Sequence, residues 1–399
     1  MMESWRWFGP LDAITLSEVA QTRANGVVTA LHEIPYGEVW SIDAIQTRQR
    51  MIAEDKAAGL IWNVVESLPL HEDIKRGTGD LATLFANYRQ SLKNLADCGV
   101  KVVCYNFMPL LDWTRTQLDA PLPGGSTALR FSTVQMAAFE IHMLKRIGAE
   151  ADYSNSVCEA AQDWFAASTG TDQDVLLSSI MAGLPGAFDR YDVAGLQEAL
   201  QCYDGMKRTD LRANFARFLS EIIPVAQDLG MRMCVHPDDP PRDILGLPRI
   251  VTTGDDIGWV MDQQDVQANG LTLCSGSLGA NPQNDVPAIA RRFADRIHFA
   301  HLRNVCVETD GSFQEATHLG GDTDMIAVLQ VLLSEENRRK VDGRQDAVIP
   351  FRADHGHMML DDHARAAHPG YPLIGRMCGL AELRGAIAAL GHDGNRTTP

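Results

Sequence analysis

The chain has 399 residues, of which 45% are hydrophobic and 22% are charged. This composition is close to the average of folded globular proteins, and it excludes a chain that is disordered throughout. The excess of 52 acidic over 35 basic residues gives a net charge of −17, which argues against a protein that binds nucleic acid or an anionic membrane. At about 150 residues per domain the length suggests two or three domains, but a single α/β barrel takes about 250 residues before insertions.

The N-terminus and the cysteines indicate the compartment. The first ten residues, MMESWRWFGP, lack the basic and apolar regions of a secretory signal, and no stretch approaches the roughly 20 apolar residues of a membrane span. Eight cysteines are scattered without a CxxC pair, which is typical of reduced thiols: Cys98, Cys104, Cys158, Cys202, Cys234, Cys274, Cys306 and Cys378. We therefore expect a soluble cytoplasmic protein.

Eight short apolar runs rich in β-branched residues are spread along the chain. Near-continuous runs of this kind are typical of strands that are covered on both faces, as in a parallel sheet. The predicted strands are residues 5–8, 26–31, 60–65, 100–105, 231–236, 271–274, 296–301 and 347–352.

Segments with helical spacing lie between these strands. The sequence predicts helices over 42–58, after a capping Ser41, and over 81–97 and 211–229. Eight strands that alternate with helices predict a (β/α)8 TIM barrel, in which residues 1–399 form a single domain. A doubly wound open sheet is the alternative, and the absence of a GxGxxG motif after any early strand disfavours it.

Residues 110–209 interrupt this alternation after the fourth strand. They contain helical and turn-rich sequence and no convincing strand. We therefore expect a helical insertion within the barrel domain, serving as a cap over the site or as a dimer contact; a homodimer is the expected assembly.

Candidate metal ligands follow four successive predicted strands. His236 ends the fifth strand, Cys274 the sixth and His301 the seventh, and Asp354 follows the eighth. Because the carboxyl ends of barrel strands converge on one mouth, we expect these side chains to meet there. Two imidazoles, a thiolate and a carboxylate can hold a divalent first-row metal, which polarises a substrate oxygen when the site is open.

Each ligand taken alone also has an ordinary structural explanation. A lone cysteine such as Cys274 packs as a small hydrophobic residue. His301 shares its strand with His298, and either is compatible with a place in the core. His236 precedes a stiff polar loop, and Asp354 begins a polar Asp-His-Gly-His string, neither of which packing requires. The position of all four at strand ends favours the metal site.

Other polar residues near these strand ends are candidates for catalysis and substrate binding. His355 adjoins Asp354, which puts a general acid or base within reach of the metal, and Tyr371 is a second candidate for proton transfer. Arginines suit a carboxylate clamp, although a surface location is their ordinary alternative. The candidate substrate-binding residues are Arg303, Arg352, Arg376 and the loop residue His318.

Motifs along nearly the whole chain resemble the mannonate dehydratases of hexuronate breakdown. They are WRWFGP (5–10), GVVTALHEIPYGEVWS (26–41), ESLPLHEDIK (66–75), CYNFMPLLDWTRT (104–116), AGLPGA (182–187), CVHPDDPPRDILGLPRIV (234–251), FAHLRN, HLGGDTDM, RADHGHMMLDD and HPGYPLIGR.

This resemblance implies a xylose-isomerase-like barrel that removes water from D-mannonate to give 2-dehydro-3-deoxy-D-gluconate, with manganese or ferrous iron (Mn²⁺ or Fe²⁺) as cofactor. It further implies that His236, Cys274, His301 and Asp354 are the metal ligands, and that His355 and Tyr371 take part in proton transfer.

The chain departs from the family pattern at three places, and none of them removes a ligand. The family commonly has two histidines where this chain has His32-Glu33, a proline at Ala353 and often a tyrosine at Leu278. These departures concern substrate contacts and the choice between D-mannonate and an epimeric aldonate. The alternative functions are a metal-dependent sugar isomerase or epimerase of the same fold and a catalytically inactive sugar-acid-binding protein.

Overall fold

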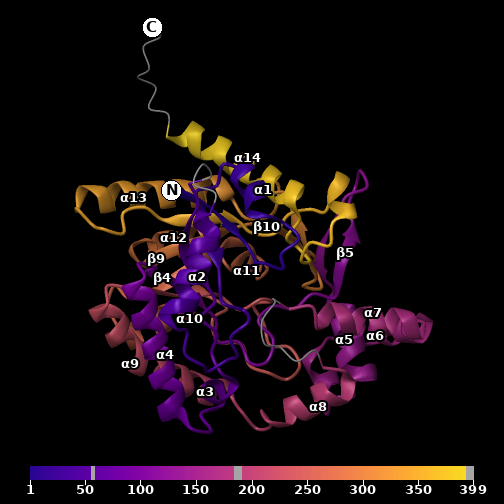
Figure 1. Ribbon diagram of the computed structural model, residues 1–399. Coiled ribbons are helices and arrows are strands. Elements are labelled where there is room, and N and C mark those ends of the chain that lie inside the picture. Colours follow the sequence, from indigo (N-terminus) through magenta and orange to yellow (C-terminus); the bar gives the residue numbers. More distant parts are fainter. Residues whose placement is uncertain (55–58, 184–190, 392–399) are drawn as a thin grey trace.

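Eight parallel strands close into a barrel in the computed structural model, which describes residues 1–54, 59–183 and 191–391 (Figure 1). In order around the barrel the strands are β1 (Met2–Arg6), β12 (Pro350–Ala353), β9 (Ile297–Leu302), β8 (Asn269–Cys274), β7 (Arg232–Val235), β4 (Val102–Tyr105), β3 (Ile61–Glu66) and β2 (Gly26–Thr29). Each corresponds to one of the eight predicted strands. The predicted (β/α)8 barrel is confirmed.

Strand register places the predicted site residues side by side. Cys274 is the register partner of His301, and His301 is also the partner of Arg352 on its other side. Because the strands are parallel, these positions lie at the same end of the barrel, where the carboxyl ends meet. The mouth at this end therefore collects the polar residues that close each strand.

Helices surround the barrel, and the three helices predicted from periodicity are present. The surrounding helices are α1 (Leu16–Gln21), α2 (Ile42–Ala53), α3 (Glu72–Arg76), α4 (Leu81–Asp97), α9 (Arg208–Asp228), α10 (Gly254–Gln263), α11 (Ser275–Gly279), α12 (Val286–Arg292), α13 (Met325–Val341) and α14 (Leu373–Leu390). The Ser41 side chain accepts a hydrogen bond from the backbone N–H of Ala44, which caps α2 as predicted. The part of this predicted helix at 55–58 lies outside the described residues.

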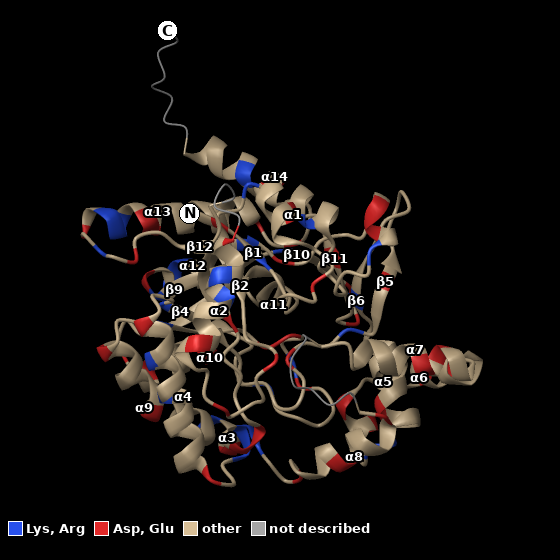
Figure 2. Cartoon of the chain, in the orientation of Figure 1, with Lys and Arg blue, Asp and Glu red and all other residues tan. Residues whose placement is uncertain are grey.

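The apolar stripe of α4 explains how the helices attach to the barrel. Its residues Phe85, Tyr88 and Leu92 are buried, and the Tyr88 ring meets Phe218 of α9 edge-on with the centroids 5.2 Å apart. Burial of each such side chain stabilises the fold by roughly 1.5–3 kcal/mol. The outer faces carry interspersed charges (Figure 2), and on α4 one pair, Lys93 and Asp97, is one turn apart with its charged atoms 2.6 Å apart.

The prediction that residues 110–209 contain no strand is wrong. Within them β5 (Gln117–Pro121) and β6 (Thr127–Phe131) form an antiparallel hairpin. This hairpin joins β10 (Asn304–Val307) and β11 (Phe313–Ala316) in a second sheet of order β10-β11-β6-β5. Each strand has only four or five residues, and the hairpin is held in its sheet by the distant strand β11, so the alternation of residues within the segment is a weak signal.

The remainder of the segment is helical, as expected. It contains α5 (Thr133–Ala138), α6 (Asn155–Ala167), α7 (Gly170–Ile180), α8 (Val193–Gln201) and two short turns of helix, and residues 184–190 lie outside the described part. Figure 1 shows α5 to α8 gathered on one side of the molecule, away from α13 and α14. No helix among the described residues is long and apolar enough to cross a membrane.

Candidate active site

The four predicted metal ligands meet at the carboxyl-end mouth of the barrel. The donor atoms of His236, Cys274 and His301 all lie within 4.8 Å of one another, and His236 Nε2 is 3.0 Å from His301 Nδ1. The Asp354 Oδ2 atom is 3.9 Å from the Cys274 Sγ atom and 4.0 Å from His301 Nδ1. The structure therefore brings all four side chains together.

The spacing of these donors and the ionisation of Cys274 fit a divalent metal. Donor atoms that surround one metal tetrahedrally at about 2.0–2.3 Å lie roughly 3.3–3.8 Å apart, close to the distances seen here. Burial would raise the pKa of the Cys274 thiol, but Arg303 and His236 hold it well below its usual range. The sulfur is therefore a thiolate, which is the form that binds metals.

Two arginines orient the Asp354 carboxylate between the donor group and the cavity. The Arg303 Nε–H donates to Asp354 Oδ2 over 2.9 Å, and Arg352 Nη1 donates to Asp354 Oδ1. Burial opposes ionisation of this carboxyl, but Arg352 and next His355 hold its pKa well below the usual range. Asp354 is therefore ionised and held in one orientation.

Glu66, which the sequence reasoning did not single out, supports the same group from β3. Its two oxygens accept from Arg352 over 2.8 and 3.1 Å, and its Oε2 lies 3.3 Å from His301 Nε2. It is 3% exposed, so its charge requires these partners. The signal for Glu66 was present, because it is an acidic residue that closes a predicted strand, as His301 closes another.

Glu315 and Asp239 extend the network from outside the barrel, and sequence reasoning missed both. Arg303 donates to Glu315 Oε1 over 2.8 Å and to Asp239 Oδ2 over 2.6 Å. Arg115 binds the two Asp239 oxygens over 2.8 and 3.1 Å and Glu315 Oε1 over 3.0 Å. Glu315 comes from β11, so its position depends on the second sheet.

An enclosed cavity beside the metal donors contains both predicted proton-transfer residues. His236, Asp354, His355 and Tyr371 line it, and His355 and Tyr371 are 5% and 2% exposed. The His355 Nδ1 atom lies 2.9 Å from Glu315 Oε1, and its Nε2 lies 3.8 Å from Asp354 Oδ1. The Tyr371 hydroxyl lies 3.5 Å from the same Asp354 oxygen. Asp354 thus separates the metal donors from the proton-transfer pair.

The comparisons with known proteins agree with this site. The model of the family described as D-mannonate dehydratase (UxuA) matches residues 1–396. The chain belongs to this family. The predicted resemblance is thereby confirmed, and with it the predicted reaction of a hydro-lyase, the dehydration of D-mannonate.

Relatives of the same name match over nearly their full lengths. A mannonate dehydratase of Chromohalobacter salexigens is 52% identical over 391 residues, which cover 98% of this chain and 99% of the relative. Mannonate dehydratase 1 of Agrobacterium fabrum is 51% identical over 395 residues and covers 98% of both chains. The crystal structure of a mannonate dehydratase from Streptococcus suis serotype 2 superposes with a TM-score of 0.76 at 33% identity, covering 100% of this chain and 96% of that one.

In this member of the D-mannonate dehydratase family, two of the four predicted substrate-binding residues hold protein carboxylates. Arg352 lines the cavity, but its guanidinium binds Glu66 and Asp354. Arg303 is 1% exposed and binds Asp354, Glu315 and Asp239. Both arginines therefore orient the site through its carboxylates.

The other two predicted substrate-binding residues do not line this cavity. Arg376 stacks on the Trp5 ring, 3.9 Å from its centroid, and donates to the backbone oxygens of Arg6 and Pro372 over 2.9 and 3.1 Å. His318 is 4% exposed, and burial lowers its pKa to about 4. Arg303, Arg376 and His318 are therefore all absent from the lining of this cavity.

We expect Glu66→Gln to lower the free energy of unfolding by about 3–5 kcal/mol, because it leaves the buried Arg352 charge with less compensation. The matched control is Asp255→Asn, which breaks an ion pair with Arg292 in which the aspartate side chain is 95% exposed. This control should cost about 0–1 kcal/mol. Urea unfolding of both variants measures the difference, and equal small losses would contradict the account of the network.

Proposed function

We propose that His236, Cys274, His301 and Asp354 hold Mn²⁺ or Fe²⁺, and that His355 and Tyr371 carry out the proton transfers of D-mannonate dehydration. One observation carries this proposal: Asp354 faces the donor atoms of Cys274 and His301 with one oxygen and the proton-transfer pair with the other. A substrate in the cavity would contact both groups at once. When bound, such a metal acts as a Lewis acid that stabilises the negative charge that develops beside the substrate carboxylate.

The reaction removes a proton from C2 and hydroxide from C3. A carbon acid next to a carboxylate is very weak, so the C2 proton requires a well-placed base. His355 is suited to this role because the Glu315 carboxylate can only accept a hydrogen bond, which keeps the proton on His355 Nδ1. Its Nε2 is therefore the atom that takes the C2 proton, and Glu315 stabilises the resulting imidazolium.

Tyr371 is the general acid in this scheme. Burial raises the pKa of its hydroxyl above the ordinary value, so the side chain holds its proton at neutral pH. The Tyr371 Oη–H donates this proton to the C3 hydroxyl as the C–O bond breaks, and water leaves. The enol that remains tautomerises to the 2-keto acid, 2-dehydro-3-deoxy-D-gluconate.

Further proposals concern the other residues and the state of the chain. Substrate binding by Arg303, Arg352, Arg376 and His318 stays a prediction. The single domain over residues 1–399, with an insertion at 110–209, also stays a prediction, and so does the homodimer. The cytoplasm is the proposed location, and the eight free cysteines support a reducing compartment.

The first prediction concerns metal retention. We expect metal-depleted protein to lose activity, and Mn²⁺ or Fe²⁺ to restore formation of the 2-keto-3-deoxy acid from D-mannonate. Cys274→Ala should retain no metal after dialysis, because the thiolate is lost from the donor set. The control is Cys234→Ala, a fully buried thiol in the barrel interior that is outside this donor group.

Metal content by mass spectrometry and product formation together decide this prediction. Zn²⁺ should bind well and support little activity, because it favours closed tetrahedral sites. Zn²⁺ as the most activating metal, or full metal retention by Cys274→Ala, would contradict the proposed centre.

The second prediction separates base from acid. In D₂O, Tyr371→Phe should still exchange the C2 hydrogen of D-mannonate with solvent while dehydration falls by about 10²- to 10⁴-fold, because only the acid is missing. His355→Gln should lose both exchange and dehydration. Proton NMR measures the exchange. Exchange that survives in His355→Gln and disappears in Tyr371→Phe would reverse the two roles.

A further inference from the structure

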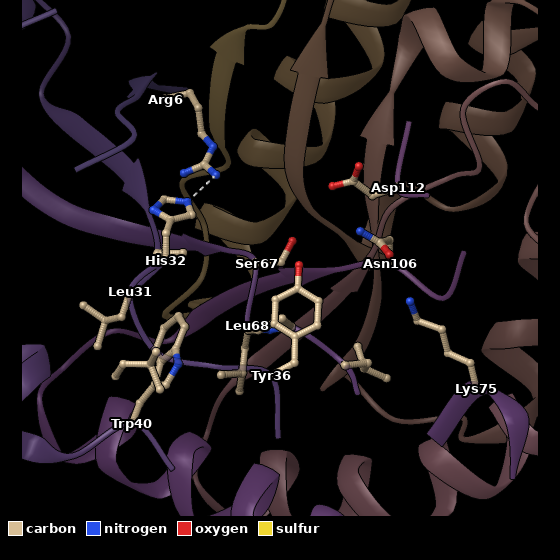
Figure 3. Close-up of a pocket in the computed structure, with 14 residues that line it drawn as sticks. Arg6, Leu31, His32, Tyr36, Trp40, Ser67, Leu68, Lys75, Asn106 and Asp112 are labelled. Atoms are coloured by element: carbon tan, nitrogen blue, oxygen red, sulfur yellow. Dashed lines mark hydrogen bonds between the residues drawn. The ribbon is translucent and has the colours of Figure 1, made fainter. Parts of the chain in front are cut away.

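A second cavity adjoins the one that His236, Asp354, His355 and Tyr371 line. Ser67, Asn106 and Asp112 line both cavities, and Arg6 and His32 line only the second. Figure 3 shows Arg6 and His32 together on one side of this second cavity, with Asn106 and Asp112 on the opposite side. A single small molecule can therefore contact residues of both cavities.

Arg6 is a buried cation whose donors are poorly used. The residue is 1% exposed, and its guanidinium lies over the Phe8 ring, 4.5 Å from the centroid. Its Nη1 reaches two backbone oxygens only at 3.5 Å, and its Nε has no hydrogen-bond partner among the described residues. No carboxylate of the described part of the chain forms an ion pair with it.

His32, the strongest partner of Arg6, brings no negative charge. Arg6 Nη2 lies 3.1 Å from His32 Nε2, and an arginine can only donate, so this ring nitrogen accepts. Burial, and next the Arg6 charge, lower the pKa of His32 well below its usual range, so the ring is neutral. The pair therefore presents one positive charge that no carboxylate of the described residues contacts directly.

Other buried arginines differ from Arg6. Arg115, Arg303 and Arg352 are all ion-paired with carboxylates. Arg249 and Arg376 lack such pairs, but they donate to backbone oxygens over 3.1 and 2.9 Å, and neither lines the two cavities. Among these six arginines, only Arg6 both lines one of the two cavities and lacks a carboxylate partner.

The second cationic side chain that lines this cavity is already neutralised. Lys75 Nζ donates to Glu72 Oε1 over 2.5 Å and to the Met108 backbone oxygen over 2.7 Å. Among the described residues, an anion that enters the cavity therefore meets its one positive charge without a contacting carboxylate at Arg6, on the side opposite Asp112. Isolated buried charges are costly, which favours a ligand that brings the opposite charge.

We propose that Arg6, supported by His32, binds the carboxylate of the aldonate substrate. This inference rests on the proposed function, because the carboxylate is the one anionic group of an aldonate. β1 pairs with β12 in the barrel, so Arg6, the last residue of β1, lies at the same mouth as Asp354, the residue that follows β12. Phe8, which lies against Arg6, meets the Tyr371 ring edge-on at 4.9 Å. Arg6 and the proposed acid thus pack against the same side chain, Phe8.

This placement also assists the chemistry. Negative charge accumulates on the substrate carboxylate as the C2 proton leaves, and a guanidinium held against it stabilises that charge. Arginine is well suited because its planar fork can donate two parallel hydrogen bonds to a carboxylate.

The test compares a charged ligand with a neutral one. The 3-deoxy analogue of D-mannonate lacks the leaving hydroxyl and is not dehydrated, and its amide lacks only the charge. Calorimetry with the Mn²⁺-loaded protein gives the dissociation constant of each. Arg6→Gln should weaken binding of the carboxylate by about 10- to 100-fold and leave amide binding within about threefold, because one charge-assisted contact is lost.

Two further variants keep this test decisive. Arg6→Lys retains the charge and should bind the carboxylate more tightly than Arg6→Gln does. If Arg6→Gln does not fold, Arg6→Lys is compared with the wild-type chain instead. Arg339→Lys makes the same exchange at a buried arginine that binds Glu335 and the backbone oxygen of Ile297, and it should leave both affinities unchanged.

Equal losses for carboxylate and amide, or no loss in Arg6→Gln, would overturn the assignment of Arg6 while dehydration of D-mannonate by the wild-type chain still stands. A wild-type chain that binds neither analogue and does not dehydrate D-mannonate would overturn the proposed function as well. A lower carboxylate affinity with unchanged amide affinity supports the assignment.

Discussion

The buried ion-pair network around Arg303 is the constraint on which the site depends. This one guanidinium binds Asp354, Glu315 and Asp239 at 2.6–2.9 Å, and it also lowers the pKa of the Cys274 thiol. Buried charges of this kind are stable only when each has its partners, because removing one leaves the others uncompensated. The network therefore fixes the proposed metal ligand Asp354 and the His355 partner Glu315 together.

The second sheet positions charged residues of this network. Glu315 lies on β11, which pairs with the hairpin strand β6, and Arg115 lies just before β5. Inside the site, Arg115 donates to both Asp239 and Glu315. The segment between β4 and β7 is thus connected to the active site through buried charges, in addition to any role as a cap or dimer contact.

Sequence could predict the barrel and the convergence of the four candidate metal ligands because both depend on local signals. Each strand is an apolar run, and His236, Cys274 and His301 are polar or reactive residues at the ends of such runs. Parallel topology then requires these ends to converge. The helix over 81–97 was likewise predictable, since its apolar positions repeat with helical spacing.

The rest of the site could not be predicted because it depends on tertiary pairing. Glu315 is one acidic residue in a four-residue strand, and nothing nearby in the sequence indicates that it meets His355. Sequence offered Arg303, Arg352 and Arg376 for the substrate carboxylate, and the structure shows Arg303 and Arg352 bound to protein carboxylates and Arg376 bound to backbone oxygens through Nε and Nη1. Whether a buried arginine such as Arg6 has a carboxylate partner depends on distances that only the folded structure defines.

Anomalous X-ray diffraction at the manganese edge, from crystals of the Mn²⁺-loaded protein, tests the central claim most directly. The account predicts one strong peak within bonding distance of His236, Cys274, His301 and Asp354, with Arg303 still bound to Asp354. A strong peak elsewhere, or a metal at the mouth that Asp354 does not bind, would contradict it.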